Sequence, residues 1–229
     1  MTMLKQAMYA AGVLALTASF AMADTGTVTQ LSGTLSVRKS DGSVRILSQR
    51  SQIQSGDTVS TEQDSYAQIR FTDGGQLTLK PNTAVKIDQF KFSEDKPSED
   101  SFLYSLVKGG LRAVTGIVGK RSRDKYQVGT ATATIGIRGT TLSADDCVNS
   151  REGDCARLDS AVYIGVADGE VVVRNGQGEI GLTAGQFGMI QSGQRPLFLT
   201  TDPGLTFVPP ATIIQSLMSF KAGGECAVR

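Results

Sequence analysis

The hydrophobic pattern of this chain has a period of two, and dipeptides that favour tight turns interrupt it. Four such dipeptides lie between alternating apolar runs: Asp41-Gly42, Asp73-Gly74, Asp168-Gly169 and Asn175-Gly176. They accept the positive φ angles of short hairpin turns. The runs predict strands over residues 34–38, 44–47, 66–71, 76–79, 85–87, 132–137, 162–166, 170–174, 180–182 and 187–190. No helical pattern separates them, so we expect an all-β domain of many short strands over residues 24–200.

Residues 131–142, which read A-T-A-T-I-G-I-R-G-T-T-L, form the most distinctive run. Their alternation predicts a half-buried strand. Arg138 inside such a strand needs either water or a fixed partner. Gly139 removes a side chain where the backbone bulges or approaches another strand closely. Both residues are interpreted first as holding the fold together, and second as contacting a ligand or partner.

The first 23 residues predict export. One charge, Lys5, precedes an apolar stretch over residues 7–18, and Ala21-Met22-Ala23 provides the small side chains that a signal peptidase requires. We therefore expect a signal peptide over residues 1–23, a mature chain that begins at Asp24, and a periplasmic location. The apolar stretch is short for a retained membrane anchor. No later segment is long and apolar enough to span a bilayer.

The three cysteines lie in the exported part. Cys147 and Cys155 enclose seven residues, V-N-S-R-E-G-D, a mostly polar, turn-forming set, and an oxidising compartment favours a disulfide between them. A metal site that uses both thiolates with nearby aspartates is the weaker alternative, because a second pair of soft ligands is missing. Cys226 is the odd cysteine, and it could stay free or join two chains into a dimer.

The tail over residues 201–229 differs from the rest of the chain. Ile213, Ile214, Leu217 and Phe220 recur at helical spacing, and two glycines follow. This pattern predicts a short amphipathic helix that docks on the β domain. A membrane-surface helix is less favoured, because the stretch carries a single charge, Lys221, and no basic face.

Catalytic signals are sparse. The chain has no histidine, which removes histidine-based triads, general bases and metal clusters. A G-x-G-x-x-G match over residues 176–181 lies in a strand–turn–strand stretch with no following helix, so the geometry that cradles phosphate is missing. We expect no enzyme activity, no cofactor and no metal. The basic loop over 119–125 and the charged loop over 93–101 read as solvated loops.

Charge balance argues against nucleic acid as a partner. Removal of Lys5 with the signal leaves 22 basic and 22 acidic residues, whereas a general nucleic-acid binder carries a basic excess.

Six short elements in a fixed order resemble the domain of the FecR family. The family pattern runs G-D-x-I-x-T, A-x-L-x-F, D-G-S-x-L-x-L-x-P-x-S, G-x-L-R, A-x-I-G-V-R-G-T, and G-x-V-x-V with L-x-A-G-Q. This chain matches it at residues 56–61, 67–71, 73–83, 110–113, 133–140 and 171–186. The candidate site residues, structural or contact-making, are Gly56, Asp57, Asp73, Gly74, Arg138, Gly139 and Thr140.

The resemblance implies a mostly β periplasmic module, built as a twisted β-solenoid or a sandwich. In the family's signalling members, a cytoplasmic anti-sigma segment and a transmembrane helix precede the module. Here only a few residues precede the apolar run, so we expect a stand-alone domain without direct anti-sigma activity. Such a domain would bind an unidentified envelope protein in sensing or assembly, with strand addition at an open sheet edge as one mode.

The alternative function is binding of cell-wall glycan or another envelope polysaccharide. Sugars usually stack on aromatic side chains, and this chain has no tryptophan. The composition therefore disfavours a glycan site.

Export predicts a defined new N-terminus. Sequencing of the protein from an envelope fraction should begin at Asp24. Recovery of the chain from the cytoplasm with Met1 in place would contradict the predicted location, and it would remove the oxidising environment on which the disulfide prediction rests.

Overall fold

The computed structural model describes residues 25–205, 210, 211, 213 and 214. The predicted signal segment, Asp24, Cys226 and most of the predicted tail helix lie outside these residues. Two of the tail residues that are described, Ile213 and Ile214, donate their N–H groups to the carbonyl of Pro210. Ile213 is fully buried, in agreement with a helical turn that docks on the rest of the chain.

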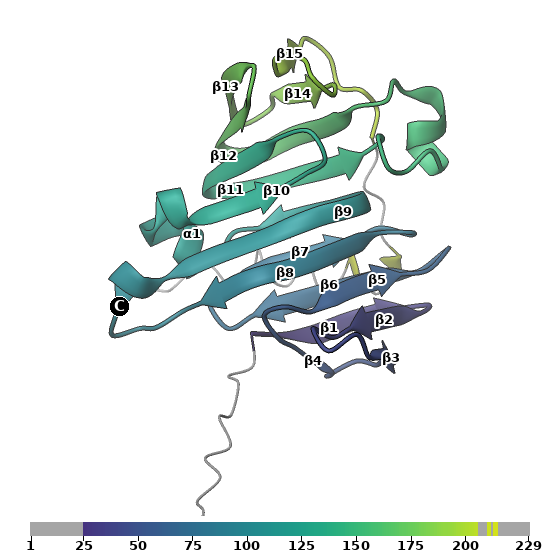
Figure 1. Cartoon of the computed structure of the whole chain (residues 1–229), viewed down its shortest axis with the longest axis vertical. Coiled ribbons are helices and arrows are strands. Elements are labelled where there is room, and N and C mark those ends of the chain that lie inside the picture. The colour runs from purple at the N-terminus through teal and green to yellow at the C-terminus, as the bar shows by residue number, and fades with distance from the viewer. Residues whose placement is uncertain (1–24, 206–209, 212, 215–229) are drawn as a thin grey trace, which may run out of the picture.

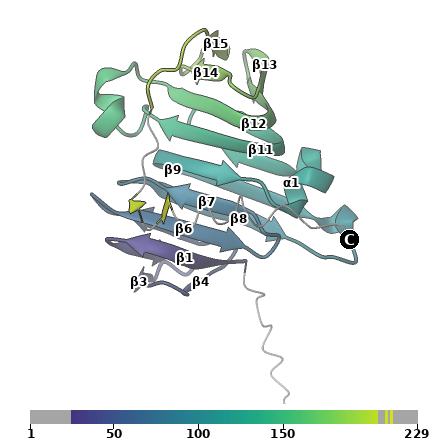
Figure 2. The ribbon, with the colours of Figure 1, turned by 180° about the vertical axis from the view of Figure 1, so that it is seen from behind.

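The described residues form fifteen strands arranged in two layers that share their longest members (Figures 1 and 2). The first layer has the order β4 (Gln52–Ile53), β1 (Gly26–Ser32), β6 (Tyr66–Phe71), β7 (Gln76–Leu79), β9 (Ser101–Val114), β11 (Thr134–Asp146), β12 (Val162–Asn175), β14 (Phe187–Ile190) and β15 (Leu197–Leu199). The second has the order β3 (Val44–Leu47), β2 (Leu35–Arg38), β5 (Thr58–Thr61), β8 (Ala84–Lys91), β9, β10 (Tyr126–Gly129), β11, β12 and β13 (Gly178–Thr183).

Three long strands pass from one layer to the other. The first half of β9 pairs with β8 and β10, whereas its second half pairs with β7 and β11. β11 and β12 divide their partners in the same way. Each strand changes layer at a glycine with a positive φ: Gly109 at 82°, Gly139 at 66° and Gly169 at 78°. The fold is therefore a sandwich whose layers are continuous through three bent strands.

The bends of β11 and β12 lie against each other. The register between the two strands shifts between Arg138 and Thr141, which is the mark of a bulge. A Cβ atom on Gly169 would lie 2.3 Å from the carbonyl oxygen of Gly139, so no larger residue fits there. The expectation of a bulge at Gly139 is confirmed. The predicted hairpin turn at Asp168-Gly169 is wrong, because β12 continues through it.

The core fills the space between the layers. Phe71 from the first layer packs against Phe102 from the second, with ring centroids 4.5 Å apart, and Phe90, Tyr104 and Tyr126 extend this cluster. Aromatic pairs at such distances add to the free energy gained from burial. Burial raises the pKa values of Tyr104 and Tyr126 above their usual range, which keeps both hydroxyls neutral.

The two loops expected to be solvated are joined to each other. The charged loop contains the 3-10 turn η1 (Pro97–Glu99), and the basic loop forms α1 (Ile117–Arg121) and η2 (Arg123–Lys125). Asp100 is fully buried and lies 2.6 Å from Nε of Arg121. Residues 94–99, 120, 121, 124 and 125 are exposed, as expected of solvated loops. The two loops are nevertheless joined, because the buried carboxylate of one is neutralised by the guanidinium of the other.

Gly169→Ala tests the interlocked bends. We expect it to lower the free energy of unfolding more than Gly185→Ala, whose φ of 82° is as strained but whose Cβ would meet nothing within 4 Å. Left-handed strain alone costs about 1–2 kcal/mol, and the clash should add at least about 1 kcal/mol. Urea unfolding of both variants measures the difference. Equal losses would contradict the close approach to Gly139.

Candidate functional site

The Gly56-Asp57 element fixes a turn. Gly56 has a φ of 90°, and the buried carboxylate of Asp57 lies 2.8 Å from Nζ of Lys39. The same carboxylate accepts the N–H of Gln54 at 2.9 Å. These contacts attach the turn before β5 to the end of β2, which is a structural role.

The Asp73-Gly74 element joins a hairpin to α1. The Asp73 carboxylate accepts the N–H of Gly75 at 2.9 Å and that of Val118 at 3.1 Å, and its carbonyl accepts the N–H of Ile117. Asp73 is 2% exposed, and burial raises the pKa of its carboxyl group. Gly74 supplies the positive φ that the β6–β7 turn requires.

Thr140 locks the bend of β11. Its N–H is donated to Oγ1 of Thr115 at 2.9 Å, and that hydroxyl donates in turn to the Thr140 carbonyl at 2.6 Å. The Thr140 hydroxyl donates to the carbonyl of Glu170 in β12. Every polar group of Thr140 is thus used inside the fold.

Arg138 has the fixed partner that its strand position requires. Its Nη1 lies 3.1 Å from a carboxylate oxygen of Glu170. Both side chains are more than 40% exposed, and exposed ion pairs contribute about 0–1 kcal/mol. Removal of Arg138 should therefore change the free energy of unfolding by about 0–1 kcal/mol.

Four of the seven candidate residues come together. Asp73, Gly74, Gly139 and Thr140 line one shallow groove of about 380 Å³ beside α1. Arg138 precedes the bend there, whereas Gly56 and Asp57 lie at a different turn. Because the polar groups of Asp73 and Thr140 bind the backbone, this groove favours the structural interpretation of the motifs.

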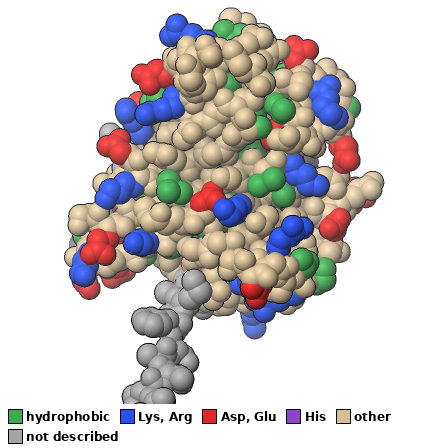
Figure 3. Space-filling model, viewed as in Figure 1, with side chains coloured by type: hydrophobic (Ala, Val, Ile, Leu, Met, Phe, Trp, Pro, Cys, Tyr) green, Lys and Arg blue, Asp and Glu red, His purple; other side chains and the backbone are tan. Residues whose placement is uncertain are grey.

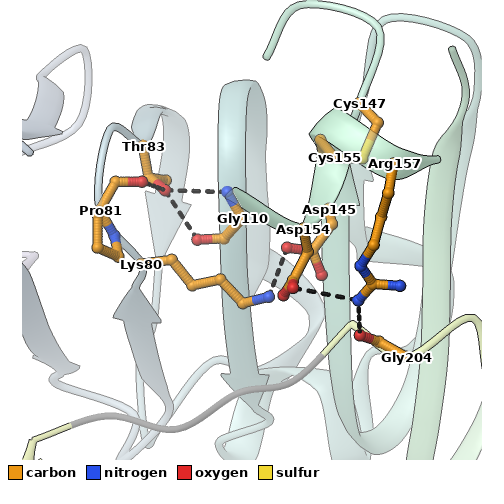
Figure 4. A network of polar contacts seen from close by, with 10 residues as sticks. All are labelled: Lys80, Pro81, Thr83, Gly110, Asp145, Cys147, Asp154, Cys155, Arg157 and Gly204. Atoms are coloured by element: carbon orange, nitrogen blue, oxygen red, sulfur yellow. Dashed lines mark hydrogen bonds and ion pairs between the residues drawn. A yellow bond between two sulfur atoms is a disulfide. The ribbon is translucent and has the colours of Figure 1, made fainter. Parts of the chain in front are cut away.

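A larger cavity, of about 680 Å³, opens where β7 and β11 end beside the bend of β9 (Figure 4). It contains a buried ion pair in which Nζ of Lys80 lies 2.6 Å from Asp145. Burial raises the pKa of the Asp145 carboxyl, and the charge of Lys80 partly offsets this rise. A Cβ at Gly110 would lie 2.0 Å from the Asp145 carboxylate, so the pair needs glycine at that position. Thr83 holds Gly110 through hydrogen bonds to its N–H and its carbonyl.

The disulfide loop forms the opposite wall of this cavity. Cys147 and Cys155 are bonded, with their Cα atoms 5.0 Å apart, and both are buried. The loop contacts the β7–β8 turn through a hydrogen bond from Asn82 to Glu152. Arg157, at the end of η3 (Gly153–Arg157), donates to Asp154 and to the carbonyl of Gly204 (Figure 4). The predicted disulfide thus shapes a site.

The side chains that line the cavity could form hydrogen bonds and stacking contacts with a bound molecule. Asp64, Asp145, Glu152 and Asp154 line it with Lys80 and the half-buried ring of Tyr66. The charge of Asp145 is neutralised by its ion pair with Lys80. Among the described residues, no group of three or more histidine, cysteine or acidic side chains is placed to hold a metal ion.

The FecR family model, described as "FecR protein", matches residues 57–172. The chain belongs to the FecR family. The match includes the bends of β9, β11 and β12, the Lys80–Asp145 pair and the disulfide. The FecR family is regulatory rather than catalytic, and membership supports a signalling or sensing module.

Solved structures provide further comparisons for this FecR domain. Two crystal structures of a protein provisionally described as an anti-sigma factor, from Parabacteroides distasonis ATCC 8503, match with TM-scores of 0.48 and 0.47 at 17% and 15% identity. Each match covers 72% of this chain. The matches cover 74% of the first structure's chain and 72% of the second's. A cell surface anchoring domain matches with a TM-score of 0.27 at 28% identity, over 28% of this chain and 84% of its own. No curated protein matches.

The FecR motifs give no indication of this cavity. In the FecR pattern, Lys80 is the variable position before Pro81, and Asp145 lies beyond the element over residues 133–140. Only their pairing across β7, β9 and β11 makes them a site. Within the described ranges, no helix has the length and apolar character needed to cross a membrane.

Lys80→Met tests the buried pair. Loss of the ammonium leaves Asp145 buried and unpaired, which should cost about 3–5 kcal/mol at neutral pH. The Asp145 pKa, already raised by burial, should rise further. A folded-state pKa above the unfolded value adds a penalty at higher pH that disappears as pH falls through it. Unfolding free energies should therefore show the deficit of the variant shrinking toward acidic pH.

Lys86→Met is the matched control for this measurement. Lys86 pairs with Asp88 at the surface, with 50% and 31% of the side chains exposed, so its loss should change stability by about 0–1 kcal/mol. A Lys80→Met deficit that stays constant with pH, or equals that of the control, would contradict the role assigned to Asp145.

Proposed function

We propose that this protein is an exported FecR-type binding module, which acts in envelope sensing or assembly by binding a partner protein and performs no catalysis. Its family is regulatory. The polar groups of its main motifs are used within the fold. The predicted signal segment over residues 1–23 supports a periplasmic location, and an envelope protein is the expected partner.

The observation that carries this proposal is that the strands at the ends of the two layers have one edge without a neighbouring strand among the described residues. The two layers end in four strands, β3, β4, β13 and β15. Two of these carry large exposed apolar side chains: Val44 and Ile46 on β3, and Leu197 and Phe198 on β15. An open edge with apolar side chains is a surface to which a partner strand can be added.

The second candidate function is recognition of an envelope glycan. The polar cavity of about 680 Å³, with the carboxylates of Asp64 and Glu152, the amide of Asn82 and the ring of Tyr66, is the observation that favours it. Such groups hydrogen-bond and stack against sugars. Protein binding remains the preferred function, because a regulatory family and open sheet edges with exposed apolar side chains support it.

Site-specific photo-cross-linking separates the two functions. A photoreactive amino acid would replace Ile46 or Phe198 at the edges, Tyr66 in the cavity, or Asp95 in an exposed loop as the control, in the full exported chain. We expect a discrete protein adduct from an edge position, and none from Asp95. Unmodified protein should not sediment with purified peptidoglycan.

Two results would overturn the preferred function. Absence of any protein adduct, together with sedimentation on peptidoglycan that Tyr66→Ala abolishes, would establish the glycan candidate in its place. Adducts of equal yield from all four positions would indicate nonspecific contact.

A further inference from the structure

The β3 edge has free backbone groups beneath its exposed side chains. In the β2–β3 hairpin, Lys39 donates its N–H to the carbonyl of Ser43, and its own carbonyl accepts the N–H of Gly42, so both backbone groups of Lys39 are bonded across the hairpin. Hydrogen-bonded pairs alternate along an antiparallel ladder, which makes Val37 with Arg45 the next bonded pair. The N–H and C=O groups of Val44 and Ile46 therefore point away from β2, toward the open side.

The same two residues are the most exposed large hydrophobic side chains among the described residues. Val44 is 62% exposed and Ile46 is 68% exposed. A strand added beside β3 would pair its backbone with these residues and could cover their side chains with its own. Val44 and Ile46 thus provide both the free backbone groups and the apolar side chains that a docked strand would contact.

The charge of this edge is basic. Arg45 lies between Val44 and Ile46, and Arg38 is paired in register with Val44. Both arginines are exposed, and neither forms an ion pair within the described residues. The nearest acid in the hairpin, Asp41, accepts the N–H of Ser43 in the turn. Apolar and basic side chains lie near one another where Figure 1 labels β2 and β3 (Figure 3).

We propose that β3 is the docking edge and that its occupant is an extended segment of the partner protein in which apolar and acidic residues alternate. Apolar residues would lie beside Val44 and Ile46, and an acidic residue would lie opposite Arg45. This inference rests on the proposed function and assigns its contact surface. β3 lies outside the segment that the family model matches, so the assignment comes from the contacts of this chain.

A second copy of the chain is a poorer occupant. Two β3 strands paired about a two-fold axis at Arg45 would place Val44 opposite Ile46, and Arg45 opposite Arg45 of the other copy. Like charges directly opposite each other destabilise a strand pair. The β15 edge is also poorer, because it has three residues and directly follows Pro196. Proline next to an edge is one way in which proteins prevent strand addition.

Binding of synthetic peptides to the mature protein tests the assignment by calorimetry. The probe is a ten-residue peptide that alternates valine with aspartate or glutamate, and the control peptide carries lysine at the acidic positions. We expect the acidic peptide to bind at least about tenfold more tightly than the basic one. The variant Arg45→Glu should reverse this preference.

Ile46→Pro tests the backbone pairing. Proline removes an N–H that points to the open side and leaves the β2 ladder, made by Arg45 and Leu47, intact. Binding of the acidic peptide should fall at least about tenfold, whereas Leu197→Pro on β15 should leave it unchanged. If Ile46→Pro lowers the melting temperature, a peptide methylated at alternate amide nitrogens replaces it and should lose binding to the unchanged protein.

The outcomes separate the docking edge from the proposed function. Undetectable binding of the acidic peptide at millimolar concentration, unchanged binding by Ile46→Pro, or a dimer that Ile46→Pro dissociates would each overturn the assignment of β3. A protein adduct from Phe198 but not from Ile46 would support the proposed function but overturn the assignment of β3 as the docking edge. Absence of protein adducts from every position would overturn the proposed function itself.

Discussion

The contact between the bends of β11 and β12 is the constraint on which this structure depends. Gly169 has to lie against the carbonyl of Gly139, because a Cβ there would be 2.3 Å from that oxygen. The contact lets two long strands change layer at the same level. Thr115 and Thr140 then complete the hydrogen bonds that the bulges interrupt. Without these bends, β11 and β12 could not pair in both layers, and the main core between the layers would be lost.

The third bent strand creates the cavity. β9 turns at Gly109, where a Cβ would lie 2.5 Å from the Thr83 hydroxyl, and the next residue, Gly110, leaves room for the Lys80–Asp145 pair. At both positions a side chain would clash with a neighbouring polar group, so glycine is required. A buried ion pair contributes little net stability, but here it fixes the floor of a concave site. The disulfide loop then shapes the wall that faces it.

Hairpins and turns could be predicted from sequence, because their signals are local. Asp41-Gly42, Asp73-Gly74 and Asn175-Gly176 lie in the turns of three observed hairpins, and the Cys147–Cys155 bond followed from spacing. Asp168-Gly169 has the same local signal but sits in a bulge, since a bulge and a turn both use a positive φ. The distinction depends on Gly139, which is thirty residues away in the chain.

The long strand β9 was missed for a related reason. Its middle contains Gly109-Gly110, which looks like a break when the sequence is read as one sheet, whereas it is the passage between layers. The Lys80–Asp145 pair was missed because sixty-five residues separate its members. Long-range pairing of this kind leaves no periodic trace in a single sequence.

The division between structural motifs and binding surface follows from these contacts. A motif residue whose polar groups already bind the backbone, as those of Thr140 and Asp73 do, has little left to offer a partner. Free hydrogen-bonding groups remain at the sheet ends, where the ladder stops. β3 and β15 lie outside the matched segment of the family. A common scaffold could thus keep its bends unchanged while its end strands vary, and specificity for a partner would reside in side chains such as Val44, Arg45 and Ile46.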